Sequence, residues 1–285
     1  MNKDDFEKEV LSSDICPKNF RDIYKEFVSY QKLAMNTLNE FHRVCEKNGV
    51  PYQLAYGSLL GAIRDNGQIP WDYDTDVFVP FEEKEHLINA LKSDLDSNYY
   101  FYCPENNEKC RHVIMRLAPN GYRTEVLHVD VFYLVGSPGS AIEREKYVTS
   151  IKRLADSRYE KLVSISDGGL GYKKALKMLL AKVRLHNYSV KKMMMQYEVI
   201  CKKYPAQSAN ICIEADSFAD LYEFDGSTIW NTKLYETKAG TFRIPIEYDK
   251  ILRLEYRDYN EIMPLEERLG EMMHNYKKLK RFEGK

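Results

Sequence analysis

The stretch Y-G-S-L-L-G-A-I-R-D-N-G-Q-I-P-W-D-Y-D-T-D-V-F-V-P, from Tyr56 to Pro80, decides both the fold class and the chemistry that this chain suggests. Aspartates occupy three alternate positions, Asp72, Asp74 and Asp76, directly before an apolar run typical of a buried strand. Like charges this close repel one another, and burial raises the cost of keeping them ionised. We therefore expect a positive group to lie among them.

The alternation indicates a metal site. Side chains alternate faces along a strand, so Asp74 and Asp76 point the same way and Phe78 continues that face into the interior. Mg²⁺ typically takes one or two carboxylates plus substrate phosphates, and Mn²⁺ is the alternative ion. Asp72 precedes the strand, where it supports the metal ligands, contacts substrate or is an ordinary turn residue. Trp71 either stacks on a base of the substrate or anchors the loop, and the anchor is favoured.

A Gly-Ser pair upstream supplies a candidate phosphate site. Glycine at position 57 lets a ligand approach the backbone closely. Ser58 is predicted to cap a two-turn helix through Arg64, whose free N–H groups and positive dipole end would face a phosphate. Arg64 either adds a phosphate contact or forms an ion pair with Asp65 or Asp72. We therefore predict that Gly57, Ser58 and Arg64 bind substrate.

A third acid interrupts the strand-like segment L-H-V-D-V-F-Y-L, from Leu127 to Leu134. An ionised group among β-branched and aromatic residues is costly unless it is paired or bound to a metal. Asp130 is therefore predicted to be a catalytic residue, either a third metal ligand or the general base for an attacking hydroxyl. His128 shares its face, and a satisfied neighbour is its favoured role.

Composition limits the classes of protein to consider. The chain has 285 residues, 44% of them hydrophobic, which is enough to build a sizeable core. Its 42 basic and 43 acidic residues balance, so bulk charge predicts no nucleic-acid partner. No apolar run reaches membrane-spanning length and the N-terminus lacks a signal peptide's apolar core, so we expect a cytoplasmic protein. The six cysteines read as buried reduced thiols, in preference to a metal clip at Cys103, Cys110 and His112.

The periodicity of the chain predicts an α+β protein, with a nucleotidyltransferase-like mixed sheet flanked by helices, an inserted helical section and a small C-terminal α/β part. The expected segments are an N-terminal helical part (1–50), a catalytic core (51–140), a helical section (141–220) and a C-terminal part that completes the domain (221–285). Helices are expected over 17–48, 58–64, 82–95, 142–162, 172–204 and 248–259, and strands over 52–56, 75–79, 99–103, 112–117, 122–134 and 241–246.

The helical section is strongly basic between Lys173 and Lys203, with nine Lys or Arg residues against the single acid Glu198. The favoured interpretation of its apolar stripe is ordinary core with a solvated lysine face. That stripe consists of Leu176, Leu179, Leu180 and Val183. The alternative is that this section rests on the inner face of an anionic membrane as a peripheral contact.

The string G-S-L-L-G-A-I-R-D-N-G-Q-I-P-W-D-Y-D-T-D-V-F resembles the LicD family, a branch of the polymerase-beta-like nucleotidyltransferases that includes bacterial phosphocholine transferases and, more distantly, fukutin and fukutin-related protein. Many bacterial members read W-D-D-D-I-D where this chain has W-D-Y-D-T-D, so Tyr73 departs from that form. The later family strand is matched by V-D-V-F, residues 129–132.

A C-terminal element of the family is also present. Its Pro-x-x-Tyr-Asp-x-x-Leu pattern is matched by Pro245 to Leu252, and its Tyr-Gly-Asp-Tyr by Tyr256 to Tyr259, followed by Pro264. Arg257 stands where the family usually has glycine. The resemblance thus runs in islands from about residue 52 to 264, with little of it in 142–220.

The resemblance implies that a phosphorylated alcohol, with phosphocholine the best candidate, moves from a CDP-activated donor to a hydroxyl of a cell-surface glycan or glycolipid, such as a teichoic acid, lipopolysaccharide or capsule precursor, and releases CMP. In such a reaction Asp74 and Asp76 would hold Mg²⁺ on the diphosphate, and Asp130 would complete the metal shell or deprotonate the acceptor. Gly57 and Ser58 would cradle a donor phosphate. Two alternatives are a nucleotidyltransferase that moves NMP from an NTP, and a non-catalytic binding module, which the three intact acids disfavour.

Overall fold

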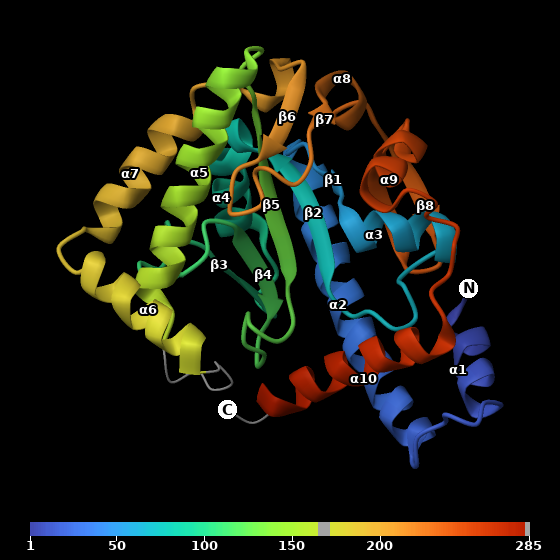
Figure 1. Ribbon diagram of the computed structural model, residues 1–285. Helices are drawn as coiled ribbons and strands as arrows, with labels where there is room; N and C mark the ends of the chain where they lie inside the picture. The colour runs from blue at the N-terminus through green and yellow to red at the C-terminus, as the bar shows by residue number, and fades with distance from the viewer. Residues whose placement is uncertain (165–171, 283–285) are drawn as a thin grey trace.

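A mixed sheet flanked by helices forms the body of the protein, which confirms the predicted α+β class (Figure 1). The computed structural model describes residues 1–164 and 172–282. Strands follow the order β1-β2-β5-β4-β3, and β6 joins β5 and carries β7. The strands are β1 (Gln53–Leu54), β2 (Thr75–Pro80), β3 (Tyr99–Tyr102), β4 (Met115–Pro119), β5 (Val129–Gly136), β6 (Ile211–Glu214) and β7 (Phe224–Asp225). A separate hairpin consists of β8 (Thr232–Thr237) and β9 (Gly240–Pro245).

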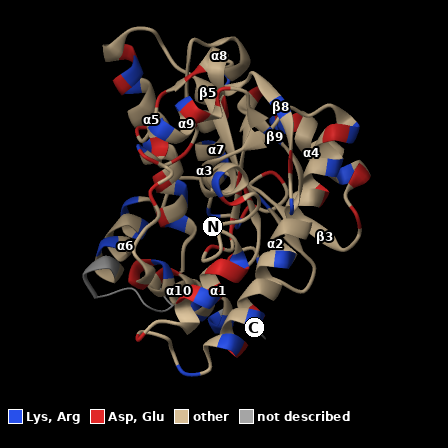
Figure 2. Cartoon of the chain, turned by 90° about the vertical axis from the view of Figure 1, so that its right-hand side faces the viewer, with Lys and Arg blue, Asp and Glu red and all other residues tan. Residues whose placement is uncertain are grey.

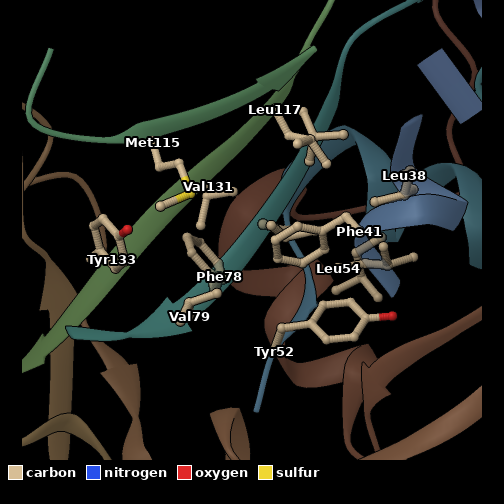
Figure 3. Packing of buried hydrophobic residues seen from close by; sticks show 14 of the residues in the cluster. Leu38, Phe41, Tyr52, Leu54, Phe78, Val79, Met115, Leu117, Val131 and Tyr133 are labelled. Carbon is tan, nitrogen blue, oxygen red and sulfur yellow. The ribbon is translucent and has the colours of Figure 1, made fainter. Parts of the chain in front are cut away.

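The β2–β5 pair is the structural centre of the sheet. These two strands run parallel, whereas β5 pairs antiparallel with both β4 and β6. The register sets Asp76 directly opposite Asp130. The strands are long apolar runs buried on both faces, as expected of a parallel pair covered by helices. Figure 3 shows Val131 and Met115 of this sheet in the core, with Leu38 and Phe41 of the long helix α2 nearby.

The helices lie in two groups around the sheet. In Figure 1, α5, α6 and α7 lie together on one side, and α3, α9 and α10 on the other. The helices are α1 (Lys3–Leu11), α2 (Phe20–Asn48), α3 (Tyr56–Leu60), α4 (Lys84–Asp94), α5 (Ala141–Leu162), α6 (Tyr172–Arg184), α7 (Val190–Cys201), α8 (Gly226–Ile229), α9 (Tyr248–Tyr256) and α10 (Leu265–Phe282). The predicted stop of the long helix is confirmed, because α2 ends at Gly49 in the left-handed conformation with φ 69°.

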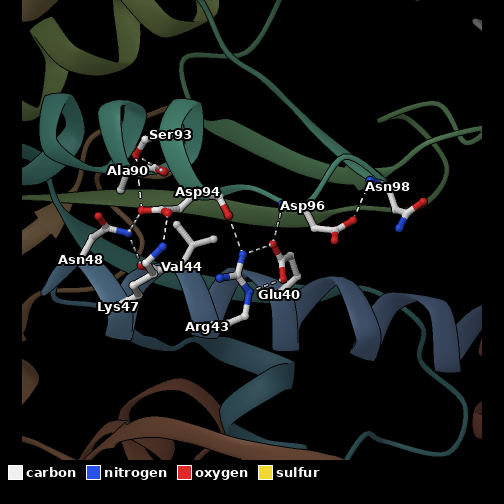
Figure 4. A network of polar contacts seen from close by, with 10 residues as sticks. All are labelled: Glu40, Arg43, Val44, Lys47, Asn48, Ala90, Ser93, Asp94, Asp96 and Asn98. Atoms are coloured by element: carbon white, nitrogen blue, oxygen red, sulfur yellow. Dashed lines mark hydrogen bonds and ion pairs between the residues drawn. The ribbon is translucent and has the colours of Figure 1, made fainter.

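A polar network joins α2 to the end of α4 (Figure 4). Arg43 donates to Glu40 at 2.6 and 2.7 Å and to the carbonyl oxygen of Asp94. Glu40 in turn accepts from the backbone N–H of Asp96 at 2.8 Å, and Lys47 pairs with Asp94. The chain leaving α4 is thereby held on α2, which fixes the position of the sheet edge that follows.

Several predictions about the middle and end of the chain were wrong. The helix expected over 172–204 is two helices, because the chain turns after α6 and Ser189 caps α7 by accepting from the N–H of Lys192. Strand β6 lies inside the segment 141–220 that was predicted to be helical, and its four residues are too short for periodicity to reveal. The strand expected over 122–134 begins only at Val129. Helices α8 and α10 and strands β7 and β8 were not predicted, and α1 was expected only as part of the helical segment 1–50.

The favoured interpretation of the basic section was also wrong. The apolar stripe of α6 does not enter the core: Leu176, Leu179, Leu180 and Val183 are all exposed. The core-facing side of the helix is instead formed by Met178 and Ala181. No helix within residues 1–164 and 172–282 is both long and apolar enough to cross a bilayer. The six cysteines are free thiols and five of them are buried, as predicted.

Candidate active site

The three aspartates of the opening stretch alternate with three buried residues. Each of the three aspartates is partly exposed, whereas the residue before each of them is buried: Trp71, Tyr73 and Thr75. Tyr73 packs edge-on against Phe27 at 6.5 Å between ring centroids, so the residue that departs from the bacterial pattern anchors this segment to α2. The predicted parity is therefore confirmed, and it begins before β2, at Asp72.

All three aspartates line one cavity of about 790 Å³. Tyr56 and Gly57 of α3 form one wall, and the segment after α9 forms another. The end of α9, that segment and α10 contribute Tyr256, Asp258, Tyr259, Glu261, Met263, Pro264, Glu267 and Glu271. The aspartate-rich stretch and the C-terminal element, more than 170 residues apart in sequence, therefore face each other across one space.

Carboxylates dominate the electrostatics of this cavity. Burial, together with the charges of Asp74 and Asp130, raises the pKa of Asp76 well above its usual range. Burial, and a hydrogen bond and repulsion from Asp74, do the same to the pKa of Asp72. The pKa of Glu271 on α10 is raised by burial and by Asp74. Each of these shifts would be relieved by a cation in the cavity.

Asp130 has protein partners of its own. Arg116 of β4 donates to it at 2.7 Å and His128 lies 3.1 Å away. Although burial opposes ionisation, the charges of His128 and Arg116 hold the pKa of Asp130 well below its usual range. Asp130 lines a separate pocket of about 140 Å³, with Arg111 and His112. The sequence predicted a partner or a metal for Asp130, and the structure supplies the partner.

Arg116 is a residue that sequence reasoning missed. It occupies a single charged position in the strand M-R-L-A-P, and register sets it directly opposite Asp130. A lone arginine in an otherwise apolar strand was a readable signal for an ion pair, because a buried charge requires a counterion.

The arrangement fits a cation held by two carboxylates. In the described part of the chain, no three His, Cys, Asp or Glu side chains converge as a metal cage. Asp74 and Asp76 nevertheless face the same cavity, and two carboxylates completed by substrate phosphates are a usual environment for Mg²⁺. The predicted third ligand, Asp130, lies beside Asp76 across the strand pair but is engaged with Arg116.

Ser58 does not cap a helix, which corrects the prediction. Helix α3 begins at Tyr56, two residues earlier, and continues into a π-helical turn over Gly61–Asp65. Within it, the Ser58 hydroxyl accepts the backbone N–H of Asp76 at 2.8 Å. Ser58 therefore positions the start of β2, because this N–H belongs to Asp76, the last of the three aspartates.

Gly57 is required by a close approach. A Cβ atom added at this position would lie 3.3 Å from Oδ2 of Asp72, tighter than ordinary contact. The absence of a side chain therefore leaves room for a carboxylate, in addition to any ligand.

Arg64 and Trp71 contact other protein side chains, as expected of residues that anchor the loop before β2. Arg64 pairs with Asp65 at 2.8 Å, one of the two alternatives that the sequence left open, and its guanidinium lies 5.6 Å from the ring centre of Trp71. The Trp71 ring also packs on Phe6 and beneath Arg268. Both residues line the cavity, so their predicted contacts with substrate stay predictions.

A second group of acids behind the cavity was missed. Tyr56, whose backbone has φ 45°, donates its hydroxyl to Glu214 of β6. Burial raises the pKa of Glu214 to about 10 and that of Glu255 of α9 to about 8. Both carboxylate oxygens of Glu255 are buried without a hydrogen-bond partner. The signal available in the sequence was one glutamate inside each of two apolar elements, I-C-I-E and I-L-R-L-E.

Arg257 adopts a backbone conformation that favours glycine. It follows α9 with φ 59° and ψ −101°, and a positive φ is sterically costly for a residue with a Cβ atom. The turn that brings Asp258 and Tyr259 to the cavity is thus made despite the substitution.

Comparisons with known proteins find a family similar to the part of the chain that forms this site. Residues 49–153 match the family described as LicD/FKTN/FKRP, nucleotidyltransferase domain. Over this segment the chain is similar to the LicD family, as the resemblance of its motifs predicted. The matched residues carry the aspartates of β2 and the Asp130 strand.

Curated relatives match over short segments. The lipopolysaccharide cholinephosphotransferase LicD of Haemophilus influenzae is 36% identical over 69 residues, which are 24% of this chain and 26% of that protein. An uncharacterized protein of Rickettsia prowazekii is 36% identical over 82 residues, 29% of each chain, and one of Rickettsia typhi is 35% identical over 82 residues, 29% of this chain and 25% of that one. The match thus spans about a quarter of the length of these relatives.

Proposed function

We propose that this protein transfers a phosphorylated alcohol, phosphocholine in the first instance, from a CDP-activated donor to a hydroxyl of a cell-surface glycan or glycolipid precursor. The observation that carries the proposal is the single cavity in which Asp72, Asp74 and Asp76 face the C-terminal element of a LicD-like chain. The similarity to a lipopolysaccharide cholinephosphotransferase supports the choice of donor and of acceptor class.

In this proposal Asp74 and Asp76 hold one divalent cation, Mg²⁺ or Mn²⁺. The ion would neutralise the diphosphate charge that builds up during transfer, for which the protein mainly supplies positioning. Ser58 fixes the backbone of Asp76, and Gly57 leaves room for Asp72 beside it. Asp130 and Arg116 form the other side of the strand pair, where an acceptor hydroxyl approaching from the smaller pocket would meet them.

The charge of the cavity supports a cationic alcohol. Seven carboxylates line it: Asp72, Asp74, Asp76, Asp258, Glu261, Glu267 and Glu271. Among the described lining residues Arg64 is the only basic one, and it is paired with Asp65. Tyr256 and Tyr259 add aromatic rings to the same wall, and a quaternary ammonium is recognised by aromatic rings and acids together. A neutral alcohol such as glycerol or ribitol gains nothing from this excess of negative charge.

Ligand-dependent thermal stability tests the proposal before the acceptor is known. The full chain is heated with CDP-choline, CDP-glycerol, CDP-ribitol, ATP or CTP, each with and without Mg²⁺ or Mn²⁺. A ligand at a hundredfold over its Kd adds about 2.7 kcal/mol of stability. We expect a shift with CDP-choline that requires the divalent ion and is absent in Asp76→Asn.

Two outcomes would contradict it. A shift with ATP or CTP alone, followed by pyrophosphate release, would assign NMP transfer from an NTP. A shift with CDP-glycerol or CDP-ribitol but not with CDP-choline would support transfer from a CDP-alcohol, but it would contradict the proposal that the transferred alcohol is cationic.

A further inference from the structure

Helix α6 carries apolar side chains on two opposite faces. Met178 and Ala181 are buried on the side toward α5. On the outer side, Leu176, Leu179, Leu180 and Val183 are 50 to 68% exposed. Single exposed apolar residues are common, but four at the spacing i, i+3, i+4, i+7 form a continuous stripe along one face. This outer stripe has no partner among the described residues that would account for it.

The next helix in the chain, α7, also exposes apolar side chains. Met195 and Val199 of α7 are 62% and 74% exposed. They are four residues apart, so they lie one above the other on the same face of α7. We call the exposed residues of α6 and α7 the outer hairpin surface: Leu176, Lys177, Leu179, Leu180, Val183, Arg184, Lys191, Lys192, Met195 and Val199.

Basic side chains flank the stripe. Lys177 is exposed beside it on α6, and Lys191 and Lys192 are exposed at the start of α7. Arg184 also lies beside the stripe, but it pairs with Glu160 of α5 at 2.9 Å. Figure 2 shows basic bands along α6. The single acid between residues 173 and 203, Glu198, is half-buried and pairs with Lys84 and, at 3.6 Å, with Lys202. It is therefore engaged and does not offset the basic side chains of the outer hairpin surface.

We propose that the outer hairpin surface binds an anionic lipid bilayer. An apolar stripe flanked by Lys and Arg is the pattern of a helix that lies in the interface, with apolar side chains in the headgroup region and cations on anionic lipids. A second copy of the chain is a poorer occupant, because two such surfaces would bring like charges together. This binding goes beyond the transfer reaction and does not depend on it.

Vesicle co-sedimentation of the full-length protein tests the proposal. The vesicles are phosphatidylcholine alone or with about 30% phosphatidylglycerol, chosen to give a negative surface. We expect binding to the anionic vesicles only, weakening as salt rises and screening shortens the reach of the charges.

Two sets of variants separate the stripe from the charges. Leu179→Ser with Leu180→Ser should weaken binding at least about tenfold, because it removes apolar area that would be buried in the bilayer on binding. Lys177→Gln, Lys191→Gln and Lys192→Gln should each weaken it about fivefold. The matched control is Leu234→Ser with Leu254→Ser, because these leucines of β8 and α9 are 52% and 45% exposed and lie outside the outer hairpin surface, so binding should stay unchanged.

The proposal is overturned if the wild type ignores anionic vesicles, or if the control pair weakens binding as much as Leu179→Ser with Leu180→Ser. It is also overturned if the protein self-associates without lipid and the stripe variant alone becomes monomeric, which would assign the surface to a second copy. Should the leucine variant lose thermal stability, the lysine set decides, because exposed lysines can be changed without a cost to the core.

Discussion

The segment from Trp71 to Asp76 and the α6 stripe from Leu176 to Val183 look alike as patterns and end up in opposite situations. In both, apolar or aromatic residues recur at the period of the local structure. In the first, the large side chains enter the core and the acids face a cavity. In the second, the leucines face outward, while Met178 and Ala181 contact the protein.

The difference lies in what each segment can pack against. Trp71 and Tyr73 have aromatic neighbours from α1 and α2, so their burial needs no further partner. Helix α6 has two apolar faces, and within residues 1–164 and 172–282 only α5 and α7 lie beside it, so that one of these faces stays exposed. Periodicity thus determines which residues share a face, and the neighbouring elements determine which face is buried.

The largest effect on activity is expected in the aspartate segment, from Trp71 to Asp76. Asp76→Asn should lower the rate of CMP release from CDP-choline by about 10³ or more, because a metal ligand that acts on the developing charge is lost. Its melting temperature should hold or rise, since a buried like charge is removed. Asp14→Asn, in an exposed turn, serves as control and should change neither quantity. Full activity in Asp76→Asn would refute the assigned role.

Arg116→Ala should destabilise the fold by about 3–5 kcal/mol, because it removes the arginine partner of the buried Asp130 and leaves His128 as the neighbouring group that stabilises its charge. Urea unfolding measures this loss. The double variant Arg116→Ala with Asp130→Asn should recover part of this lost stability, because a neutral amide replaces the carboxylate that lost its arginine. Equal losses in the single and double variants would mean that the ion pair contributes little.

The two faces of α6 can be compared within one helix. Met178→Ala should cost about 2–5 kcal/mol as a core truncation, and Leu180→Ala should stay within about 0.5 kcal/mol. Both are measured by chemical denaturation without lipid. If the two costs are equal, the stripe of α6 is packed in solution and the contrast with the aspartate segment disappears.

The buried Glu255 carboxyl should make the free energy of unfolding depend on pH. Its folded-state pKa of about 8 exceeds the ordinary value, so the folded protein keeps a proton that the unfolded chain releases. Stability without divalent ions should therefore fall as pH rises from about 4.5 to about 8. Glu255→Gln should make that slope shallower, because other carboxyls with raised pKa values still contribute to it, and should add on the order of 2 kcal/mol at pH 8. Glu261→Gln, exposed at the cavity, is the control and should leave the slope intact.

The smallest effect concerns the turn after α9. Arg257→Gly should stabilise the protein by about 1 kcal/mol, because glycine adopts φ 59° without the clash of a Cβ atom. Arg253→Gly, inside the same helix, should instead destabilise it by about 1 kcal/mol. Thermal melts compare the two, and a loss in both variants would show that Arg257 makes a contact that outweighs its strain.

The sequence by itself determined the elements around the site and the parity of its acids. Repeats of 3.6 and 2 residues are local properties, so α2, α4, β2 and the shared direction of Asp74 and Asp76 were predictable. It also indicated that Asp130 needs a partner, because the cost of a buried charge does not depend on fold details.

Only the tertiary structure decided which residues, distant in sequence, lie beside Asp130 and across the cavity from the aspartates. The pairing of β4 with β5 brings Arg116 to Asp130, and the turn after α9 brings Tyr256 and Asp258 opposite the aspartates. The same holds for α6, whose outer stripe was expected in the core. Contacts between elements depend on chain topology and on the space that neighbouring elements leave, and no local period encodes either of them.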